Sequence, residues 1–172
     1  MKLKEKHIAL FVEKIYEDLE LWYPYLRMKE EGAEVDIIGP EVKEYTGKHG
    51  LPVKADKSIT DVTTSDYDAL LIPGGYSPDH MRRNQKMVAF VKEMNDQNKI
   101  IAAICHAGWM LASASIVKDK KLTSFYSIKD DLIYAGANWI DEEVVVDGNL
   151  ITSRTPKDLP AYCSKIIETL SS

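Results

Sequence analysis

The stretch Lys99-Ile100-Ile101-Ala102-Ala103-Ile104-Cys105-His106-Ala107-Gly108-Trp109-Met110-Leu111 joins an apolar run to a helix-forming run. Cys105 lies at the junction, and Ala107 and Gly108 are small enough to allow a tight turn. A sharp strand-to-helix turn of this kind holds a reactive atom over the N-terminus of the next helix. Because the N–H groups at a helix N-terminus stabilise a thiolate, the position predicts a reactive cysteine whose pKa is lowered.

The alternative interpretation of Cys105 is purely structural. Free cysteines are among the most buried residue types, and most of them are inert. The adjacent His106, the small residues after it and the change from strand to helix favour the reactive interpretation. The second cysteine, Cys163, lies on the apolar stripe of a predicted helix, which is typical of a structural residue. With only two cysteines, a reducing and therefore cytoplasmic compartment is expected.

Composition limits the class of protein. The chain has 172 residues, 45% of them hydrophobic and 28% charged, which is typical of a globular protein, and we expect residues 1–172 to form one domain. The net charge of −5 disfavours nucleic acid and anionic membranes as partners, because no positive field attracts phosphates. No apolar run reaches the length of a membrane span.

Strand and helix patterns alternate along the chain. Strands are predicted at 7–12, 33–38, 67–72, at the run ending before Cys105, at 122–126 and in a hairpin over 144–152. Helices are predicted around 19–26 with a kink or restart at Pro24 and a cap at Gly32, then at 84–98, 106–115, 128–135 and from Thr155, as N-cap, to the end. The alternation predicts an α/β fold, with a mostly parallel sheet and helices on both faces. Ligands bind such folds beyond the carboxyl ends of the strands.

Three carboxylates stand together where the first helix begins, at Glu17, Asp18 and Glu20. Acidic residues stabilise a helix N-terminus, so the group has a structural explanation. A functional interpretation is that one carboxyl group is held protonated and donates a hydrogen bond to a thiolate. Spacing alone does not select among the three.

Gly74 and Gly75 follow a predicted strand and allow close approach of backbone to ligand. The Gly75 N–H, together with one from the turn around Ala107, predicts an oxyanion hole, although an ordinary tight turn explains the pair equally well. The histidines all lie at or before His106, which excludes cysteine triads with a downstream histidine. Histidine and cysteine also lack zinc-ligand spacing, so neither a metal nor another cofactor is expected.

The chain resembles the PfpI family of intracellular cysteine peptidases, in the superfamily that also contains the parkinsonism-associated deglycase and shares the fold of class I glutamine amidotransferases. The resemblance extends nearly from end to end. It is carried by Glu17-Asp18-Leu19-Glu20-Leu21-Trp22-Tyr23-Pro24-Tyr25, Thr46-Gly47-Lys48-His49-Gly50, Asp68-Ala69-Leu70-Leu71-Ile72-Pro73-Gly74-Gly75, Ile104-Cys105-His106, Ile128-Lys129-Asp130-Asp131 and Val144-Val145-Val146-Asp147-Gly148-Asn149.

The resemblance implies a flavodoxin-like three-layer sandwich with Cys105 as the nucleophile. It implies that Glu17 is the protonated acid beside the sulfur, and that His106 pairs with an acidic residue of a neighbouring subunit, which aligns with Asp79. A homo-oligomer, either a dimer or a hexamer built from dimers, is therefore expected.

The chain departs from the peptidase branch at several positions. Asp79 replaces a glutamate, which shortens the reach to His106 by one methylene, and Phe125 replaces a tyrosine, whose hydroxyl Tyr126 is a candidate to supply. Ala107-Gly108-Trp109 also differs from the usual glycine-proline continuation, and Trp109 either narrows or lines the mouth of the pocket or packs against the sheet.

Three functions follow as hypotheses. The first is a cysteine-dependent hydrolase or lyase that acts on glyoxal, methylglyoxal or their adducts on protein side chains, as in stress protection. The second is an intracellular cysteine peptidase that cleaves peptides. The third is a non-enzymatic redox sensor or stress chaperone that uses an oxidisable Cys105.

Overall fold

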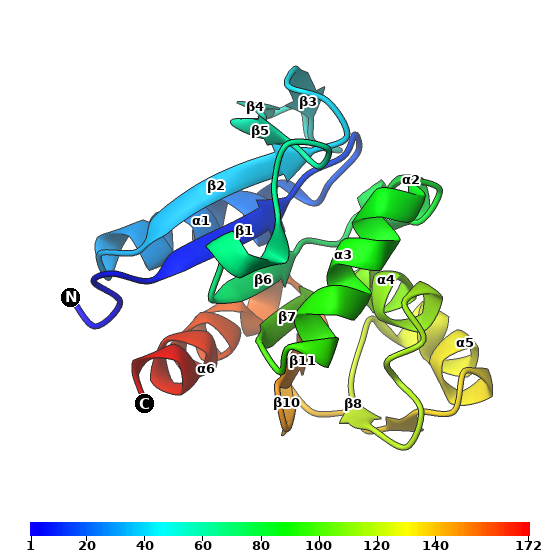
Figure 1. Ribbon diagram of the computed structural model, residues 1–172. Helices are drawn as coiled ribbons and strands as arrows, with labels where there is room; N and C mark the ends of the chain where they lie inside the picture. Colours follow the sequence, from blue (N-terminus) through cyan, green and yellow to red (C-terminus); the bar gives the residue numbers. More distant parts are fainter.

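The central strands are short apolar runs that are buried on both faces, the pattern expected of a parallel sheet covered by helices on each side. The computed structural model describes residues 1–172. Its main sheet has seven strands (Figure 1). In spatial order they are β10 (Val144–Asp147), β11 (Leu150–Ser153), β7 (Ile100–Ile104), β6 (Ala69–Ile72), β1 (His7–Phe11), β2 (Glu34–Gly39) and β5 (Lys57–Ser58).

The strand pairs from β11 to β5 are parallel, and only β10 runs antiparallel, after the turn at Gly148. The chain passes from β1 to β2 on one side and then returns to place β6 on the other side of β1. This reversal creates a crevice at the carboxyl ends of β1 and β6, where open α/β sheets bind ligands. The loops after β1 and β6 and the turn after β7 therefore meet at one end of the sheet.

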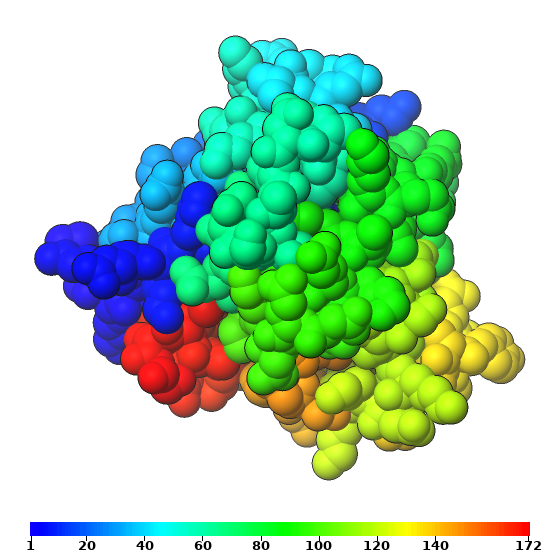
Figure 2. Space-filling view, viewed as in Figure 1, coloured from blue at the N-terminus to red at the C-terminus, as the bar shows by residue number.

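Helices cover both faces of the sheet and complete three layers (Figure 1). Helices α1 (Asp18–Glu30) and α6 (Leu159–Ser171) pack on one face. The other face is covered by α2 (Ser77–Met81), α3 (Gln85–Asp96), α4 (Gly108–Ser113) and α5 (Lys129–Tyr134). Figure 2, in the same view as Figure 1, shows the green segment that contains α3 on the near face of the molecule. None of the helices is both long and apolar enough to cross a lipid bilayer.

The predicted fold class is confirmed, and most element boundaries agree to within a few residues. Helix α1 continues through Pro24, so the predicted restart there is wrong, whereas Gly32 caps the helix at a φ of +93° as expected. The strand predicted at 122–126 shrinks to β8 (Lys121–Leu122), which pairs with β9 (Asn138–Trp139).

Two further differences concern helix beginnings and small hairpins. A 3-10 turn, Pro156–Asp158, leads directly into α6, and Thr155 occupies the predicted N-cap position of this turn, although its side chain makes no capping hydrogen bond. Another 3-10 turn begins at Cys105 itself. The sequence interpretation also missed the hairpin of β3 (Glu44–Thr46) and β4 (Pro52–Lys54), which is too short for a hydrophobic period to reveal.

Gly75, in the loop after β6, lies against the backbone of the loop after β1. It bridges to Tyr16 and has a φ of +70°, and a Cβ atom placed on it would lie 2.4 Å from the backbone nitrogen of Glu17. Only glycine fits both the conformation and the space.

We expect Gly75→Ala to lower the free energy of unfolding by more than about 3 kcal/mol, because the loop backbone at residues 15–17 must move and residue 75 must keep a strained φ. Gly50→Ala is the matched control, since Gly50 has a φ of +95° with open space around it. It should cost only about 1 kcal/mol. Urea unfolding of both variants measures the difference, and equal losses would contradict the packing argument.

Candidate active site

Cys105 lies at the end of β7, where the chain turns sharply into α4. Its φ of +62° is in the left-handed region, which non-glycine residues seldom adopt and which often marks a functional position. The side chain is largely buried, and the Phe125 N–H donates to the Cys105 carbonyl oxygen at 3.2 Å. The predicted strand-to-helix turn is thus present, with the strain that a nucleophile elbow carries.

Glu20 is the carboxyl group that faces the Cys105 side chain. It is only 1% exposed, its Oε2 accepts the Gly74 N–H at 2.8 Å, and its Oε1 has no nitrogen or oxygen partner. Burial raises the pKa of Glu20 to about 8, against the opposing hydrogen bond from Gly74 and with a smaller contribution from the charge of Glu17. The carboxyl group is therefore protonated at neutral pH and can donate to the sulfur.

The expectation that Glu17 is the acid beside the sulfur is corrected by this arrangement. Glu17 lies just before α1, and its Oε2 is 2.6 Å from Lys48 Nζ and 3.6 Å from His49 Nε2. One helical turn separates Glu17 from Glu20, and that turn directs Glu20 inward over the strand ends. Asp18 has a structural task instead, because its carboxylate accepts the N–H groups of His49 and Leu51.

Backbone amides surround the sulfur. The backbone N–H groups of Gly75 and His106 face it and lower the pKa of the thiol, which favours the thiolate. The Gly74 N–H is bound to Glu20, so Gly74, which was expected to approach the ligand, anchors the acid instead. Ala107 is completely buried beneath the turn.

The pKa of the Cys105 thiol is raised rather than lowered. Burial is the largest cause, and a negative charge on Glu20 raises the pKa further, while the amides of Gly75 and His106 oppose both effects. The expected lowering by the helix N-terminus is therefore outweighed by burial. A proton acceptor close to the sulfur is needed to generate the thiolate at neutral pH.

His106 supplies such an acceptor. Its Nδ1 lies 3.2 Å from Cys105 Sγ. Burial lowers the pKa of His106, and the charge of Lys48 lowers it further, so the ring is neutral at pH 7. The ring stacks on Phe125 with centroids 5.0 Å apart, and Trp109 packs against it edge-on at 5.1 Å. The second nitrogen, Nε2, lies 3.1 Å from the hydroxyl oxygen of Ser127, a contact that no motif in the sequence indicated.

These groups open into a cavity of about 290 Å³ at the carboxyl end of the sheet. Eleven residues line it, namely Ile15, Glu17, Glu20, Lys48, Gly75, Tyr76, Cys105, His106, Phe125, Thr155 and Pro156. The cavity is small, more apolar than polar in its lining, and has the thiol in its wall. Its size and the thiol in its wall suit a small molecule that reacts with sulfur.

Three candidate residues from the sequence analysis do not line the cavity. The Asp79 carboxylate forms an ion pair with Arg83 and makes no hydrogen bond to His106 of the same chain. Trp109 does not line the cavity, and its indole N–H donates to Asp131 at 2.8 Å. Tyr126 is 73% exposed and also lies outside the cavity, so it does not replace the hydroxyl missing at Phe125.

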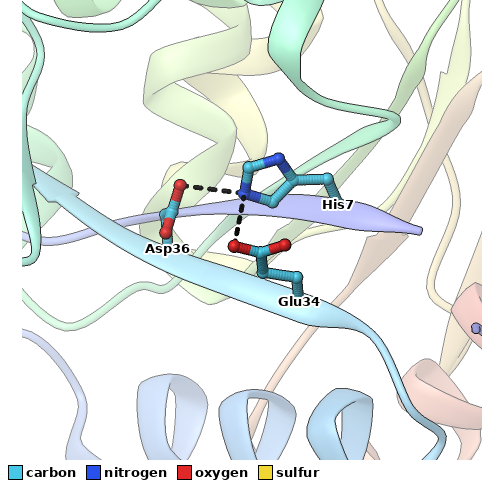
Figure 3. Close-up of side chains that lie close together, drawn as sticks. All are labelled: His7, Glu34 and Asp36. Atoms are coloured by element: carbon cyan, nitrogen blue, oxygen red, sulfur yellow. Dashed lines mark hydrogen bonds and ion pairs between the residues drawn. The ribbon is translucent and has the colours of Figure 1, made fainter. Parts of the chain in front are cut away.

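A second cluster of ionisable groups lies at the opposite end of the strands (Figure 3). His7 Nε2 is 2.9 Å from Asp36 Oδ2 and 4.0 Å from Glu34 Oε1. The same oxygen of Asp36 receives the Lys57 ammonium at 2.7 Å and the Tyr67 hydroxyl at 2.8 Å. Since a lysine already neutralises the carboxylate, we interpret this cluster as an ion-pair group that joins β1, β2 and β5.

The buried acid predicts an unusual dependence of stability on pH. Folding raises the pKa of Glu20 from 4.5 to about 8, so over this window the folded state holds a proton that the unfolded state has lost. The free energy of unfolding should therefore fall as pH rises, by up to about 1.4 kcal/mol per pH unit. Glu20→Gln cannot ionise and should lose this slope in urea unfolding between pH 5 and 8. The exposed Glu142→Gln should keep it, and an unchanged slope in Glu20→Gln would refute the assignment.

The family model described as DJ-1/PfpI matches residues 6–169. The chain is 46% identical over 155 residues to deglycase PfpI of Pyrococcus furiosus, covering 90% of this chain and 93% of that protein. It is 48% identical over 158 residues to YraA of Bacillus subtilis, named as a candidate cysteine protease, covering 91% and 94% of the two chains.

The fold is shared with solved structures. DJ-1beta of Drosophila melanogaster superposes with a TM-score of 0.91 at 27% identity, over 96% of this chain and 90% of that chain. The sequence match, the sheet order and the cysteine at the strand-to-helix turn all indicate the same family. The chain belongs to the DJ-1/PfpI family.

Proposed function

We propose that this protein is a cysteine-dependent hydrolase or lyase that acts on glyoxal, methylglyoxal or their adducts on protein side chains. One observation, the arrangement of groups around the Cys105 thiol, carries the proposal. A buried thiol has a protonated carboxyl group on one side and a neutral imidazole on the other, inside a cavity large enough for a small carbonyl compound. The name deglycase, given to the Pyrococcus furiosus relative, supports the same chemistry.

The geometry suggests a role for each group. His106 Nδ1 accepts the proton of Cys105, and the sulfur then adds to the aldehyde carbon of methylglyoxal. The oxygen that becomes negative lies close to the N–H groups of Gly75 and His106, and Glu20 donates its proton to this oxygen. The product of this step is a hemithioacetal, in which the carbon–sulfur bond is new and no electron has been lost.

Conversion to lactate then needs only proton movements and water. The proton on the former aldehyde carbon moves to the adjacent carbonyl carbon through an enediol, which leaves a thioester on Cys105. Water hydrolyses the thioester, releases lactate and restores the thiol. His106 and Glu20 are the groups near the sulfur that can accept and return these protons. No oxidant or reductant takes part.

Peptide cleavage is the second candidate, favoured by the named activity of the YraA relative. It needs the same nucleophile but must accommodate a polypeptide on both sides of the scissile bond. The cavity of about 290 Å³ fits a small carbonyl compound better than it fits an extended peptide. We therefore place peptide cleavage second.

We also propose that the chain forms a homo-oligomer through α1. Leu19, Tyr23 and Leu26 recur at helical spacing and are 55%, 39% and 59% exposed, which forms an apolar stripe on the outer side of this helix. Light scattering should give at least twice the chain mass of 19.4 kDa. The substitution Leu26→Glu should lower the measured mass, whereas Leu51→Glu, at a loop leucine that is 49% exposed, should not. A monomeric wild type would refute the proposal.

The catalytic proposal is tested by lactate formation from methylglyoxal and from methylglyoxal-adducted N-acetylcysteine. We expect turnover by the wild type and a loss of at least about a thousandfold in Cys105→Ala, because no other thiol lines the cavity to form the thioester intermediate. Cys163→Ala is the control, since this cysteine is buried on α6 away from the cavity. Equal turnover by Cys105→Ala would contradict the proposal, and peptide cleavage without lactate formation would favour the second candidate.

A further inference from the structure

The second ring nitrogen of His106 has a partner within the same chain. Nδ1 faces the Cys105 sulfur at 3.2 Å, and Nε2 lies 3.1 Å from Ser127 Oγ. A neutral imidazole carries one proton, so it can accept the thiol proton at Nδ1 only if Nε2 bears the N–H. A hydroxyl oxygen can accept that N–H, and it can still accept it when the ring has become doubly protonated.

We propose that Ser127 is the positioning residue of His106, and that Cys105, His106 and Ser127 form a linked group within one chain. The inference rests on the proposed function, which assigns the thiol proton to His106. It replaces the expectation that an acidic residue of a second subunit, Asp79, orients this ring. In that arrangement activity depends on contact between copies, whereas here each chain carries its own orienting group.

The local fold holds Ser127 at this position. Ser127 lies in the middle of a 3-10 turn, Tyr126–Ile128, that follows Phe125 directly. The Phe125 N–H is hydrogen bonded to the Cys105 carbonyl oxygen at 3.2 Å, and the Phe125 ring stacks on the imidazole. Ile128 anchors the other end of the turn in the core. The serine is therefore tied to the cysteine backbone and to the ring that it contacts.

The charged groups around His106 do not compete for Nε2. Glu17, Glu20 and Lys48 share the cavity with the ring, but Glu17 is paired with Lys48 and Glu20 with the Gly74 amide. On the other side of the ring, Trp109 holds the Asp131 carboxylate by its indole N–H. Ser127 is the group whose polar atom reaches Nε2.

The test measures the tautomer of His106 directly and needs no activity. In ¹⁵N-labelled protein at neutral pH, long-range ¹H–¹⁵N spectra should show the proton of His106 on Nε2 in the wild type. We expect Ser127→Ala to give a mixture of tautomers, and Ser127→Thr to restore the wild-type signal, because threonine retains the hydroxyl. Ser65→Ala is the matched control, since Ser65 is also exposed in the middle of a 3-10 turn.

Kinetics supply a second readout. Ser127→Ala should lower the kcat for methylglyoxal about tenfold, the effect of one lost hydrogen bond, with little change in KM, and Ser127→Thr should recover most of it. A tautomer that does not change in Ser127→Ala would overturn the inference. So would a loss of the Nε2–H tautomer in Asp79→Asn. A wild type without turnover would refute the proposed function, whereas the spectra would still decide the role of Ser127.

Discussion

The active site depends on one buried hydrogen bond, from the Gly74 amide to the Glu20 carboxyl group. Removing a carboxyl group from water is costly when it is charged, and the cost disappears when it carries a proton. The folded chain therefore keeps Glu20 neutral at neutral pH, directly beside a thiol that is itself buried. A negative charge on Cys105 and one on Glu20 disfavour each other, so the two groups titrate as a coupled pair. The proton on Glu20 is therefore available for transfer.

Three separate parts of the chain must meet to create this pair. Glu20 comes from the first turn of α1, Gly74 follows β6, and Cys105 follows β7. The parallel sheet brings them together because the strand order reverses between β1 and β6, which opens a crevice at the carboxyl ends. The space is tight, since a Cβ atom on Gly74 would lie 2.6 Å from Glu20 Oε2 and 2.7 Å from Cys105 Cβ. The glycine is what allows the acid and the thiol to approach each other.

Much of the fold could be predicted from the sequence, because apolar runs and helical spacing are local signals. The strand ending at Cys105, the hairpin around Gly148 and the cap at Gly32 are examples that the structure confirms. The family resemblance added the layered architecture. Elements with few residues, such as β8 and the β3–β4 hairpin, were misplaced or missed, because two or three residues are too few to show an alternation of apolar and polar side chains.

The site was harder to predict, because it depends on direction rather than on residue type. Three acids stood together in the sequence, and only the turn of α1 decides that Glu20 points inward while Glu17 meets Lys48. The raised pKa of Cys105 follows from burial, which no motif records. Ser127 carried no signal at all, since a serine in a turn is ordinary until the fold brings it to His106.

The most direct test of this account is an infrared difference spectrum of the wild type against Glu20→Gln. A protonated buried carboxyl group has a carbonyl band that is separate from the bands of carboxylates and amides. We predict that the wild type shows this band at neutral pH and loses it as the pH passes about 8, and that Glu20→Gln lacks it throughout. Absence of the band from the wild type at neutral pH would show that Glu20 is ionised, and would contradict the central claim.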